Sequence, residues 1–306
     1  MKALVTGGAG FIGSNVVRKL LNEGWEVRIL DNLSTGYIDN LDGLAVEMVQ
    51  GDILDASTVN SVGGIDVVFH LAASVGRQRS IDYPQQDSTI NLVGTINVLE
   101  SMRKNHIPKI VYSSSAAIFG ELMTPEIDEL HPQNADSPYG VSKLAAEKMI
   151  LSYAGIYDDI SAVCLRYFNI YGVNQRFDMY GNVIPIFAHR LLNHQPILIY
   201  GDGTQTRDFV NVIDIANANF LAAESNIKSD VFNMGSGGTI TIQKLAEMMQ
   251  EISGIDSGIE YLPERKADVK HCKANASKAN HILGFEAKVD LQDGLKSYWE
   301  WFVKNA

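Results

Sequence analysis

A tyrosine and a lysine lie four residues apart in the segment SPYGVSK, residues 137–143. Pro138 suits the first turn of a helix, and in a helix that begins there Tyr139 and Lys143 share one face. A lysine ammonium beside a phenol lowers the pKa of the phenol, so the tyrosine can exchange protons closer to neutrality. The same spacing also occurs by chance, and a purely structural helix start stays open at this point.

A second segment with chemical potential is TGGAGFIGS, residues 6–14, which follows an apolar run and opens an amphipathic one. Gly7, Gly10 and Gly13 recur every three residues, a pattern that lets the backbone turn tightly and approach a pyrophosphate. The N-terminus of the following helix presents unpaired N–H groups to negative charge. The segment predicts a nucleotide site, for which a simple tight turn is the alternative.

An acidic residue, Asp31, ends the second apolar run. Its carboxylate would accept hydrogen bonds from both hydroxyls of an adenosine ribose and repel a 2′-phosphate. No arginine or lysine lies within residues 32–37 to receive such a phosphate, so NAD is favoured over NADP. A turn aspartate is the alternative. Asp52, after the third run, is a candidate adenine contact, although a helix cap fits it almost as well.

The elements that must position these residues follow from the hydrophobic pattern. Apolar runs typical of buried strands cover residues 2–6, 26–31, 46–50, 66–72, 109–114 and 161–167. Amphipathic segments such as 15–24 and 89–105 lie between them. This alternation implies parallel strands joined by right-handed crossovers, and hence an α/β fold with a Rossmann-type doubly wound sheet.

The pattern changes after residue 168, where elements become shorter and turns more frequent. We expect a smaller mixed α/β domain that binds the substrate, formed by residues 169–208 and 236–306. Residues 1–168 and 209–235 would form the NAD-binding Rossmann domain, because the apolar segment 209–224 returns to it.

Composition narrows the class of protein. The chain has 306 residues, 46% of them hydrophobic and 20% charged, as is ordinary for a soluble globular protein. A net charge of −11 argues against a nucleic-acid partner. Two cysteines are too few for a disulfide framework, and the histidines lack metal-ligand spacing, so no metal is expected. Without a signal peptide or a membrane-length apolar run, we expect a cytoplasmic protein with no membrane partner.

Taken together and in this order, the motifs resemble the extended short-chain dehydrogenase/reductase family, in particular its NAD-dependent UDP-hexose and UDP-N-acetylhexosamine 4-epimerases. The resemblance covers almost the whole chain. The motifs that carry it are TGGAGFIGS, LDNLSTG (30–36), GDI (51–53), HLAA (70–73), NLVGTINVLE (91–100), YSSSAAIFG (112–120), SPYGVSK, RYFNIYG (166–172) and GDGTQTRDFVNVID (201–214).

The resemblance implies that Ser115, Tyr139 and Lys143 form a catalytic triad. Ser115 would bond the sugar O4, although a serine that caps a strand end is the alternative. Lys143 would hold the nicotinamide ribose, and both it and the positive nicotinamide would favour the phenolate of Tyr139. Tyr139 would take the O4 proton while C4 gives hydride to NAD. The resulting 4-keto sugar turns over and is reduced on its other face.

The resemblance also implies binding residues for both ligands. Those for the cofactor are Gly7, Gly10, Phe11, Ile12, Gly13, Asp31, Asn32, Ser34, Gly36, Asp52, Ile53, Leu71, Ala72, Ala73, Val75, Asn91, Ser113, Tyr139, Lys143, Tyr167 and Phe168. Those for the substrate are Ser115, Tyr139, Asn169, Asn182, Val183, Tyr200, Arg207, Arg265, Asp268 and Cys272. Arg207 and Arg265 would clamp the diphosphate, although a surface ion pair is the bland alternative for either.

Cys272 matches a position that lines the sugar pocket, where some family members carry tyrosine. A bulky ring there leaves no room for a 2-acetamido group, whereas a small side chain does. We therefore expect UDP-N-acetylglucosamine and UDP-N-acetylgalactosamine as substrates, with UDP-glucose and UDP-galactose as additional candidates. A buried small hydrophobe is the alternative. The run ERKAD (264–268) departs from the family pattern, which has proline and glycine after the arginine, and Phe119 stands where tyrosine is commoner.

Other functions stay open. Related dehydratases and decarboxylases need an acid directly after the hydroxyl residue, where this chain has Ala116 and Ala117. A reductase or a non-catalytic nucleotide-binding module on the same fold is a further alternative. Arg77 and Arg79 would reach a substrate anion or lie in a solvated loop. Family members commonly dimerise through the helices that here would be 86–105 and 138–155, so we expect a homodimer.

Overall fold

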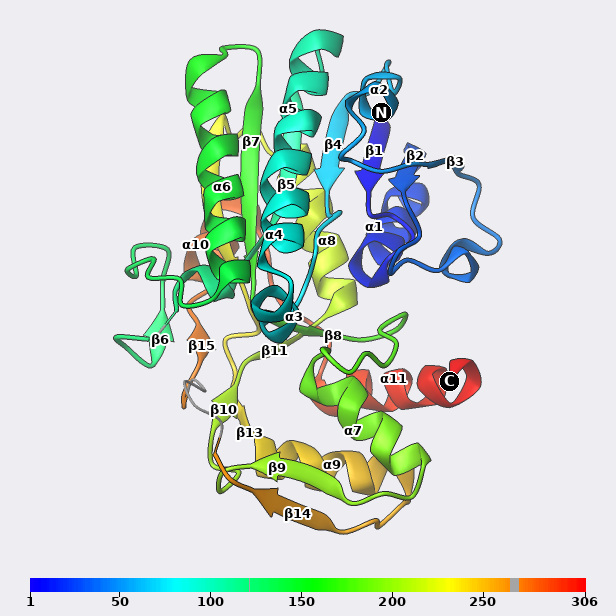
Figure 1. Ribbon diagram of the computed structural model, residues 1–306, viewed down its shortest axis with the longest axis vertical. Coiled ribbons are helices and arrows are strands. Elements are labelled where there is room, and N and C mark those ends of the chain that lie inside the picture. The colour runs from blue at the N-terminus through cyan, green and yellow to red at the C-terminus, as the bar shows by residue number, and fades with distance from the viewer. Residues whose placement is uncertain (121, 265–269) are drawn as a thin grey trace.

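The computed structural model describes residues 1–120, 122–264 and 270–306 (Figure 1). Its main sheet has seven strands in the order β12-β7-β5-β4-β1-β2-β3, and all neighbours pair in parallel. The strands are β1 (Lys2–Thr6), β2 (Glu26–Asp31), β3 (Glu47–Gln50), β4 (Val67–His70), β5 (Lys109–Ser115), β7 (Ser161–Tyr167) and β12 (Ser229–Met234). The prediction of a doubly wound parallel sheet is confirmed, and its strand order reverses between β1 and β4, where ligands bind in such folds.

Helices cover both faces of this sheet. The helices α1 (Phe11–Asn22), α8 (Val212–Glu224) and α10 (Ser277–Leu283) share one core with it, and α2 (Ala56–Asn60), α5 (Gly94–Asn105) and α6 (Pro138–Ile156) share the other. Successive strand residues point to opposite faces, so Val5 falls in the first core and Leu4 in the second. This explains why the strands are continuous apolar runs rather than alternating ones.

A smaller body lies beyond the carboxyl ends of the strands, in the lower part of Figure 1. Its elements are α7 (Val183–Leu192), β9 (Ile197–Tyr200), β10 (Thr206–Arg207), β13 (Ile240–Thr241), α9 (Ile242–Ser253), β14 (Ile259–Leu262) and α11 (Leu291–Asn305). Phe187, Leu245 and Tyr298 lie in its core. The chain passes between the two bodies through β8 (Asn169–Tyr171) and β11 (Phe209–Asn211), which pair in parallel. The domain boundaries given above stay a prediction, and α10 lies in the core of the larger body.

The helix expected over residues 89–105 is interrupted. The short helices α3 (Arg77–Asp82) and α4 (Pro84–Ser88) precede a π-helical turn over Thr89–Val93, and α5 begins only at Gly94. Such turns often mark functional sites, because an extra residue redirects the side chains of the helix. Here the turn carries Asn91, which is buried. Hydrophobic spacing does not reveal one inserted residue, so the sequence analysis missed this break.

A buried ion pair holds α6 against the sheet. Arg166 of β7 donates to both carboxylate oxygens of Glu147 in α6, from Nη2 at 2.7 Å and from Nε at 3.1 Å. The Ser114 hydroxyl of β5 donates to the same carboxylate at 2.6 Å. Arg166 is 1% exposed and Glu147 is 0% exposed. The ion pair therefore ties α6 to the two strands beneath it, one of which ends at Ser115.

The substitution Arg166→Met tests this anchor. It leaves the Glu147 carboxylate buried without a counter-charge, and we expect the free energy of unfolding, measured by urea denaturation, to fall by about 3–5 kcal/mol. The double variant Arg166→Met/Glu147→Met removes both charges, so it is expected to regain most of that loss. If the double variant were as unstable as the single one, uncompensated charge would not be the cause.

Candidate active site and cofactor cleft

The turn between β1 and α1 has the geometry of a phosphate cradle. Gly7 adopts a positive φ of 71°, and a Cβ on Gly13 would lie 2.0 Å from the carbonyl oxygen of Gly7. Glycine is favoured at residue 7 by this positive φ, and at residue 13 because any side chain would meet that carbonyl oxygen. Gly10, which precedes α1, has no side chain to cover the first N–H groups of the helix. These groups can therefore face an anion.

Asp31 lies at the end of β2, as expected for a carboxylate that binds ribose. Its Oδ2 accepts the N–H of Ala9 at 2.9 Å and its Oδ1 accepts the N–H of Leu33 at 2.8 Å. Each oxygen keeps a second acceptor position. A Cβ on Gly36 would lie 3.0 Å from both oxygens, so this glycine keeps the adjacent space clear. The carboxylate and the helix start fit a dinucleotide with free ribose hydroxyls, such as NAD.

Asn32 and Asp52, both predicted to contact the cofactor, bond to each other, with Nδ2 2.9 Å from Oδ2. Asp52 also accepts the N–H of Leu54 at 2.8 Å, so it shapes its own turn. The structural role left open for Asp52 is therefore present, and an adenine contact stays a prediction.

Other predicted cofactor residues surround the cleft or support it. Phe11 and Ile12 open α1 and pack partly against the first core, and Ile53 is buried in the second. Ser34 and Val75 are exposed in loops at the carboxyl edge of the sheet.

The loop after β4, which includes Leu71, Ala72 and Ala73, lies directly against the glycine turn. A Cβ on Gly7 would be 2.7 Å from the nitrogen of Ala72. The Ala72 N–H donates to the hydroxyl of Thr6 at 3.2 Å. The glycine turn and this loop are therefore in direct contact at the carboxyl edge of the sheet.

His70 supports this turn and loop from inside the sheet. Its Nδ1 lies 2.7 Å from the hydroxyl of Thr6 and its Nε2 lies 2.9 Å from that of Thr95, which donates to the carbonyl of Asn91 at 2.6 Å. Burial lowers the pKa of His70 to about 3, so the imidazole stays neutral. The sequence analysis did not single out His70, although the motif HLAA contains it.

Two residues predicted to contact the cofactor use their polar atoms within the protein. Asn91 accepts the N–H of Ser74 at 2.8 Å and donates back to its carbonyl at 3.1 Å. The hydroxyl of Tyr167 donates to the side chain of Asn219 at 3.0 Å. Burial raises the pKa of this phenol, and hydrogen bonds with Asn219 and Ser113 oppose the rise. In these contacts, Asn91 and Tyr167 position the loop and strand that border the cleft.

The residues predicted to be catalytic meet because α6 starts against the end of β5. The helix begins at Pro138 as predicted, and the hydroxyl of Ser137 accepts the N–H of Gly140 at 3.2 Å. A Cβ on Gly140 would lie 2.3 Å from the carbonyl oxygen of Ala117, so only glycine permits this approach. Ser115 also accepts the N–H of Ala117 at 3.2 Å. The capping role left open for Ser115 thus exists beside its place in the site.

The expected lowering of the pKa of Tyr139 is wrong for the protein by itself. Burial raises this pKa to about 12, a hydrogen bond with Ser115 opposes the rise, and the charge of Asp87 adds to it. Burial also lowers the pKa of Lys143 to about 7. Nearby acidic groups act in the opposite direction, and Asp87 has the largest effect among them. Proximity to a lysine was the wrong criterion, because removal from water outweighs it. Ionising this phenol requires additional positive charge beside it.

Asp87 and Ser142 were not singled out from the sequence, yet Ser142 is the chain neighbour of Lys143, which is predicted to be catalytic, and Asp87 bonds to Ser142. Both side chains are buried, and the hydroxyl of Ser142 donates to Oδ2 of Asp87 at 2.6 Å. Ser142 precedes Lys143 on α6 and lies within the motif SPYGVSK. Nothing in the sequence signals that α4 places an acid against this serine, because the two are 55 residues apart.

The residues expected to bind the nucleotide part of the substrate come from several elements of the smaller body. Val183 opens α7 and the exposed Asn182 precedes it, while Tyr200 ends β9. Arg207 ends β10 and donates from Nη1 to the carbonyl of Thr206 at 2.8 Å.

Three further substrate residues complete that set. Asn169 opens β8 and donates to the carbonyl of Asp208 at 3.0 Å. Arg265 and Asp268 lie outside the described residues.

Cys272 lies close to the end of β5, far from it in sequence. It packs against a small cluster that contains Phe119 and Phe168, and Ala116, the neighbour of Ser115, packs against the same cluster. Burial raises the pKa of the Cys272 thiol to about 11, and the charge of Arg207 acts in the opposite direction. Cys272 is therefore near both the catalytic strand end and a predicted diphosphate residue.

Asp208 is a second buried carboxylate that the sequence analysis missed. It accepts the N–H groups of Ser236 at 2.8 Å, Gly237 at 3.1 Å and Ala274 at 3.0 Å. Ala274 belongs to β15 (Lys273–Ala274), which pairs with β6 (Glu126–Ile127). Asp208 thus fixes the short strand that follows Cys272.

Arg77 and Arg79 are paired with carboxylates of the protein. Arg77 contacts Asp136, just before α6, at 2.9 Å. Arg79 pairs with Asp178 and lies over the ring of Tyr180, 5.2 Å from its centroid. The two arginines connect α3 to the start of the catalytic helix and to the segment before α7.

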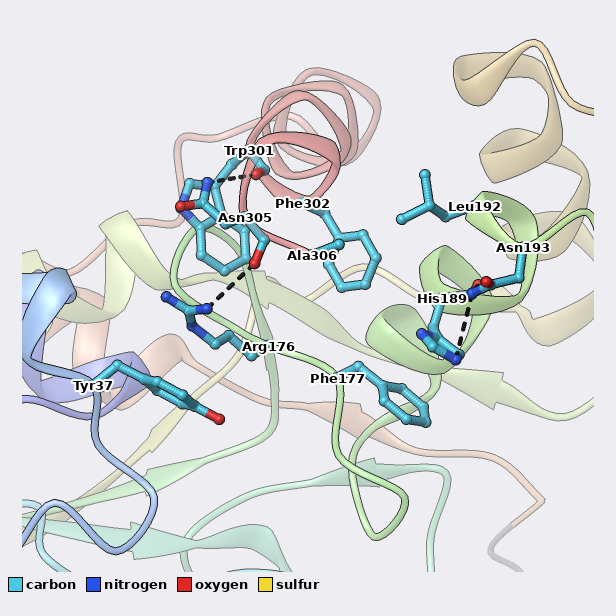
Figure 2. A pocket seen from close by; sticks show the side chains of 10 residues that line it. All are labelled: Tyr37, Arg176, Phe177, His189, Leu192, Asn193, Trp301, Phe302, Asn305 and Ala306. Carbon is cyan, nitrogen blue, oxygen red and sulfur yellow. Dashed lines mark hydrogen bonds between the residues drawn. The ribbon is translucent and has the colours of Figure 1, made fainter.

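A separate cavity of about 500 Å³ lies among α7, α11 and the segments that carry Tyr37 and Arg176 (Figure 2). Its lining includes the stacked rings of Phe177 and His189, whose centroids are 3.9 Å apart. None of the described residues predicted to bind cofactor or substrate belongs to this lining. We therefore do not assign the substrate to it.

Two other classes of site were searched for. Over residues 1–120, 122–264 and 270–306, no three histidine, cysteine or acidic side chains are grouped to hold a metal ion. In the same part of the chain, no helix combines the length and the apolar character needed to cross a membrane.

Comparison with known proteins agrees with this geometry. The chain is 40% identical over 305 residues to a Methanocaldococcus jannaschii protein to which UDP-glucose 4-epimerase activity is ascribed, covering 99% of this chain and 98% of the relative. It superimposes on the Thermotoga maritima UDP-glucose 4-epimerase solved with UDP-glucose, with a TM-score of 0.94, 37% identity and 99% of each chain covered. The UDP-N-acetylglucosamine 4-epimerase of Methanobrevibacter ruminantium, in complex with UDP-N-acetylmuramic acid, gives a TM-score of 0.94 at 34% identity, covering 100% and 99% of the two chains.

The chain also matches the family model of the NAD-dependent epimerases and dehydratases. The match covers residues 3–235, which include the glycine turn, Asp31 and the predicted catalytic residues Ser115, Tyr139 and Lys143. The chain belongs to the NAD-dependent epimerase/dehydratase family.

Proposed function

We propose that the chain interconverts UDP-N-acetylglucosamine and UDP-N-acetylgalactosamine by epimerisation at C4, with UDP-glucose and UDP-galactose as further candidate substrates. The observation that carries the proposal is the meeting of Ser115, Tyr139 and Lys143 at the edge of the sheet that also carries the glycine turn and Asp31. The two solved relatives, one with UDP-glucose and one a UDP-N-acetylglucosamine 4-epimerase, support a UDP-sugar as substrate. Ala116 and Ala117 cannot supply the acid that a dehydratase or decarboxylase needs.

Each catalytic residue has a distinct task in this reaction. Bound NAD supplies the reversible removal of hydride from C4 of the sugar. Tyr139 takes the proton from O4 and later returns it, and Ser115 holds both oxygens by hydrogen bonding. Lys143 binds the nicotinamide ribose, and its charge stabilises the phenolate in a site where burial alone disfavours it.

Epimerisation sets opposite requirements for the two ends of the substrate. The sugar must turn over between proton removal and proton return, so it cannot be gripped tightly. Affinity is therefore expected in the nucleotide contacts, remote from C4, where Arg207 and Tyr200 lie on the smaller body. Cys272 lies near the sugar end, and its small side chain supports room for a 2-acetamido group.

The variant Tyr139→Phe separates an enzyme from a binding module. It removes the hydroxyl that carries the proton, so we expect kcat for UDP-sugar epimerisation to fall by about 100-fold or more. NAD affinity, followed by calorimetry, is expected to stay close to that of the unmodified chain. Tyr157→Phe, which removes a phenol at the other end of α6, is the matched control. A Tyr139→Phe variant with full turnover would rule out the assigned chemistry.

The variant Cys272→Tyr tests the sugar assignment. Incubation with UDP-glucose, UDP-N-acetylglucosamine and their 4-epimers, followed by chromatographic separation, reports each activity. A ring at this position fills the space for the acetamido group, so we expect kcat/KM for the N-acetylated pair to fall at least about tenfold, with the unsubstituted pair retained. Cys272→Ser controls for loss of the thiol. The assignment is rejected if the unmodified chain converts UDP-glucose but leaves UDP-N-acetylglucosamine unchanged.

A homodimer through α5 and α6 is also part of the proposal. Exposed apolar side chains on or next to these helices include Val93, Val141 and Ile156, with exposed fractions of 47%, 54% and 68%. Burying them in a four-helix bundle removes apolar surface from water. Light scattering at micromolar concentration is expected to give twice the chain mass, and a single monomeric species would contradict the proposal.

A further inference from the structure

Asp87 is a buried carboxylate that the reaction outlined above does not use. It lies in α4 and is 1% exposed. Its Oδ2 accepts the hydroxyl of Ser142 at 2.6 Å, whereas its Oδ1 is buried without a hydrogen-bond partner among the described residues. A buried carboxylate with one unsatisfied oxygen is costly unless a neighbouring charge compensates it.

Lys143 supplies that compensating charge. It follows Ser142 on α6, which packs against α4, and it is 2% exposed. Its Nζ lies 4.3 Å from the centroid of the Tyr112 ring, on the face of α6 that is turned to the sheet. Asp87 is the acidic group that acts most strongly to keep Lys143 protonated. Burial raises the pKa of Asp87, and the hydrogen bond from Ser142 and the charge of Lys143 oppose that rise. The two charges therefore offset part of each other's cost of burial.

The carboxylate of Asp87 is held by a chain of hydrogen bonds that starts at the cofactor cleft. Asn91, on the π-helical turn that follows α4, bonds both backbone groups of Ser74 and donates to the hydroxyl of Ser142 at 2.9 Å. Ser142 then donates to Asp87. The distorted helix thus supplies both Asn91 and Asp87. Its hydrogen bonds therefore fix Asp87, the segment of α6 before Lys143, and the loop that carries Ser74 relative to one another.

Other titratable groups face Lys143, but each is neutral or already paired. The groups are His70 on β4, Tyr112 on β5, Cys164 on β7 and Glu147 on α6. Burial lowers the pKa of His70 to about 3 and raises those of Tyr112 and Cys164 well above their usual values. Glu147 forms its ion pair with Arg166 at 2.7 Å.

The charges on α3, which packs on α4 and α6, are also engaged. Arg77 pairs with Asp136, Arg79 pairs with Asp178, and Asp82 accepts from Gln78 at 2.9 Å. Of the two described carboxylates that raise the pKa of Lys143, Glu147 is paired with Arg166, which leaves Asp87 as the one without an arginine partner.

We propose that Asp87 is a positioning residue of the epimerase, whose carboxylate, aligned by Ser142, keeps the ammonium of Lys143 charged and in place beside the Tyr139 phenol. The inference rests on the proposed function and adds to it the group that maintains the charge of the lysine. Asp87 does not touch the substrate, so it acts on the reaction through Lys143.

The variant Asp87→Asn keeps the shape and an acceptor for Ser142 but removes the charge. Loss of a negative charge lowers the pKa of both the nearby lysine and the nearby tyrosine. The acid limb of the kcat profile, where Tyr139 takes up a proton, and the alkaline limb, where Lys143 loses one, are both expected to move to lower pH by about one unit. Asp87→Glu retains the charge and is expected to keep the limbs close to those of the unmodified chain.

The matched control is Asp214→Asn. Asp214 is a 6% exposed carboxylate on α8, where it accepts the N–H of Val289 at 3.1 Å, and it lies outside the catalytic group. A general cost of removing a buried carboxylate would reduce stability in both variants. A shift of the pH limbs in Asp87→Asn alone identifies the specific effect on Lys143.

NAD affinity measured by calorimetry across the same pH range provides a readout that needs no turnover. Because Lys143 holds the ribose, its loss of charge weakens binding at high pH, and we expect this weakening to begin at lower pH in Asp87→Asn. If neither the limbs of the kcat profile nor the pH at which NAD binding weakens were shifted in Asp87→Asn, Asp87 would be merely structural and the proposal would be overturned. If the unmodified chain epimerises no UDP-sugar but the shift in NAD binding is present, the proposed function fails and the role of Asp87 stands.

If Asp87→Asn folds poorly, the same pH profiles are measured on Ser142→Ala. That substitution removes the hydroxyl that aligns the carboxylate, and a smaller shift in the same direction is expected. An unshifted profile in Ser142→Ala would then count against the proposal.

Discussion

The site depends on how closely the first turn of α6 approaches the end of β5. At Gly140 there is no room for even a methyl group against the carbonyl of Ala117. Further along α6, the Glu147–Arg166 ion pair holds the middle of the helix against the sheet. A helix fixed at two points has one orientation, and Tyr139 and Lys143 therefore have one position relative to Ser115.

This packing creates an electrostatic difficulty for the reaction. Removing Tyr139 and Lys143 from water stabilises the neutral form of both, so the pKa of the phenol rises to about 12 and that of the ammonium falls to about 7. A site that needs a phenolate beside an ammonium must therefore be supplied with compensating charges. The same low dielectric makes those charges effective, because interactions between them are screened less than in water. The burial that disfavours the charged forms of Tyr139 and Lys143 therefore also strengthens the charge interactions that can restore them.

The fold gathers the remaining parts at one edge of the sheet. Parallel strands all end on the same side, so the glycine turn after β1, Asp31 at the end of β2, the loop after β4 and Ser115 at the end of β5 lie along one edge of the sheet. The smaller body closes over that edge and carries Tyr200, Arg207 and Cys272. The residues predicted to bind the cofactor therefore lie on the larger body, whereas the residues predicted to bind the nucleotide sugar come from both bodies.

The sequence by itself determined the features that depend on near neighbours in the chain. Apolar runs located six of the seven strands of the main sheet, all but β12, and amphipathic segments indicated α1 and α5. The spacing of Gly7, Gly10 and Gly13 indicated the phosphate turn. Pro138 indicated where the helix that carries Tyr139 and Lys143 begins. Only the tertiary structure decided the features that depend on distant partners. These are the π-helical turn at Asn91, the bond of Asp87 to the neighbour of Lys143, the burial that reverses the expected shift in the pKa of Tyr139, and the packing of Cys272 and Ala116 on one cluster. The physical reason is that desolvation and charge interactions are set by whatever the fold places within a few ångströms, whatever its distance along the chain.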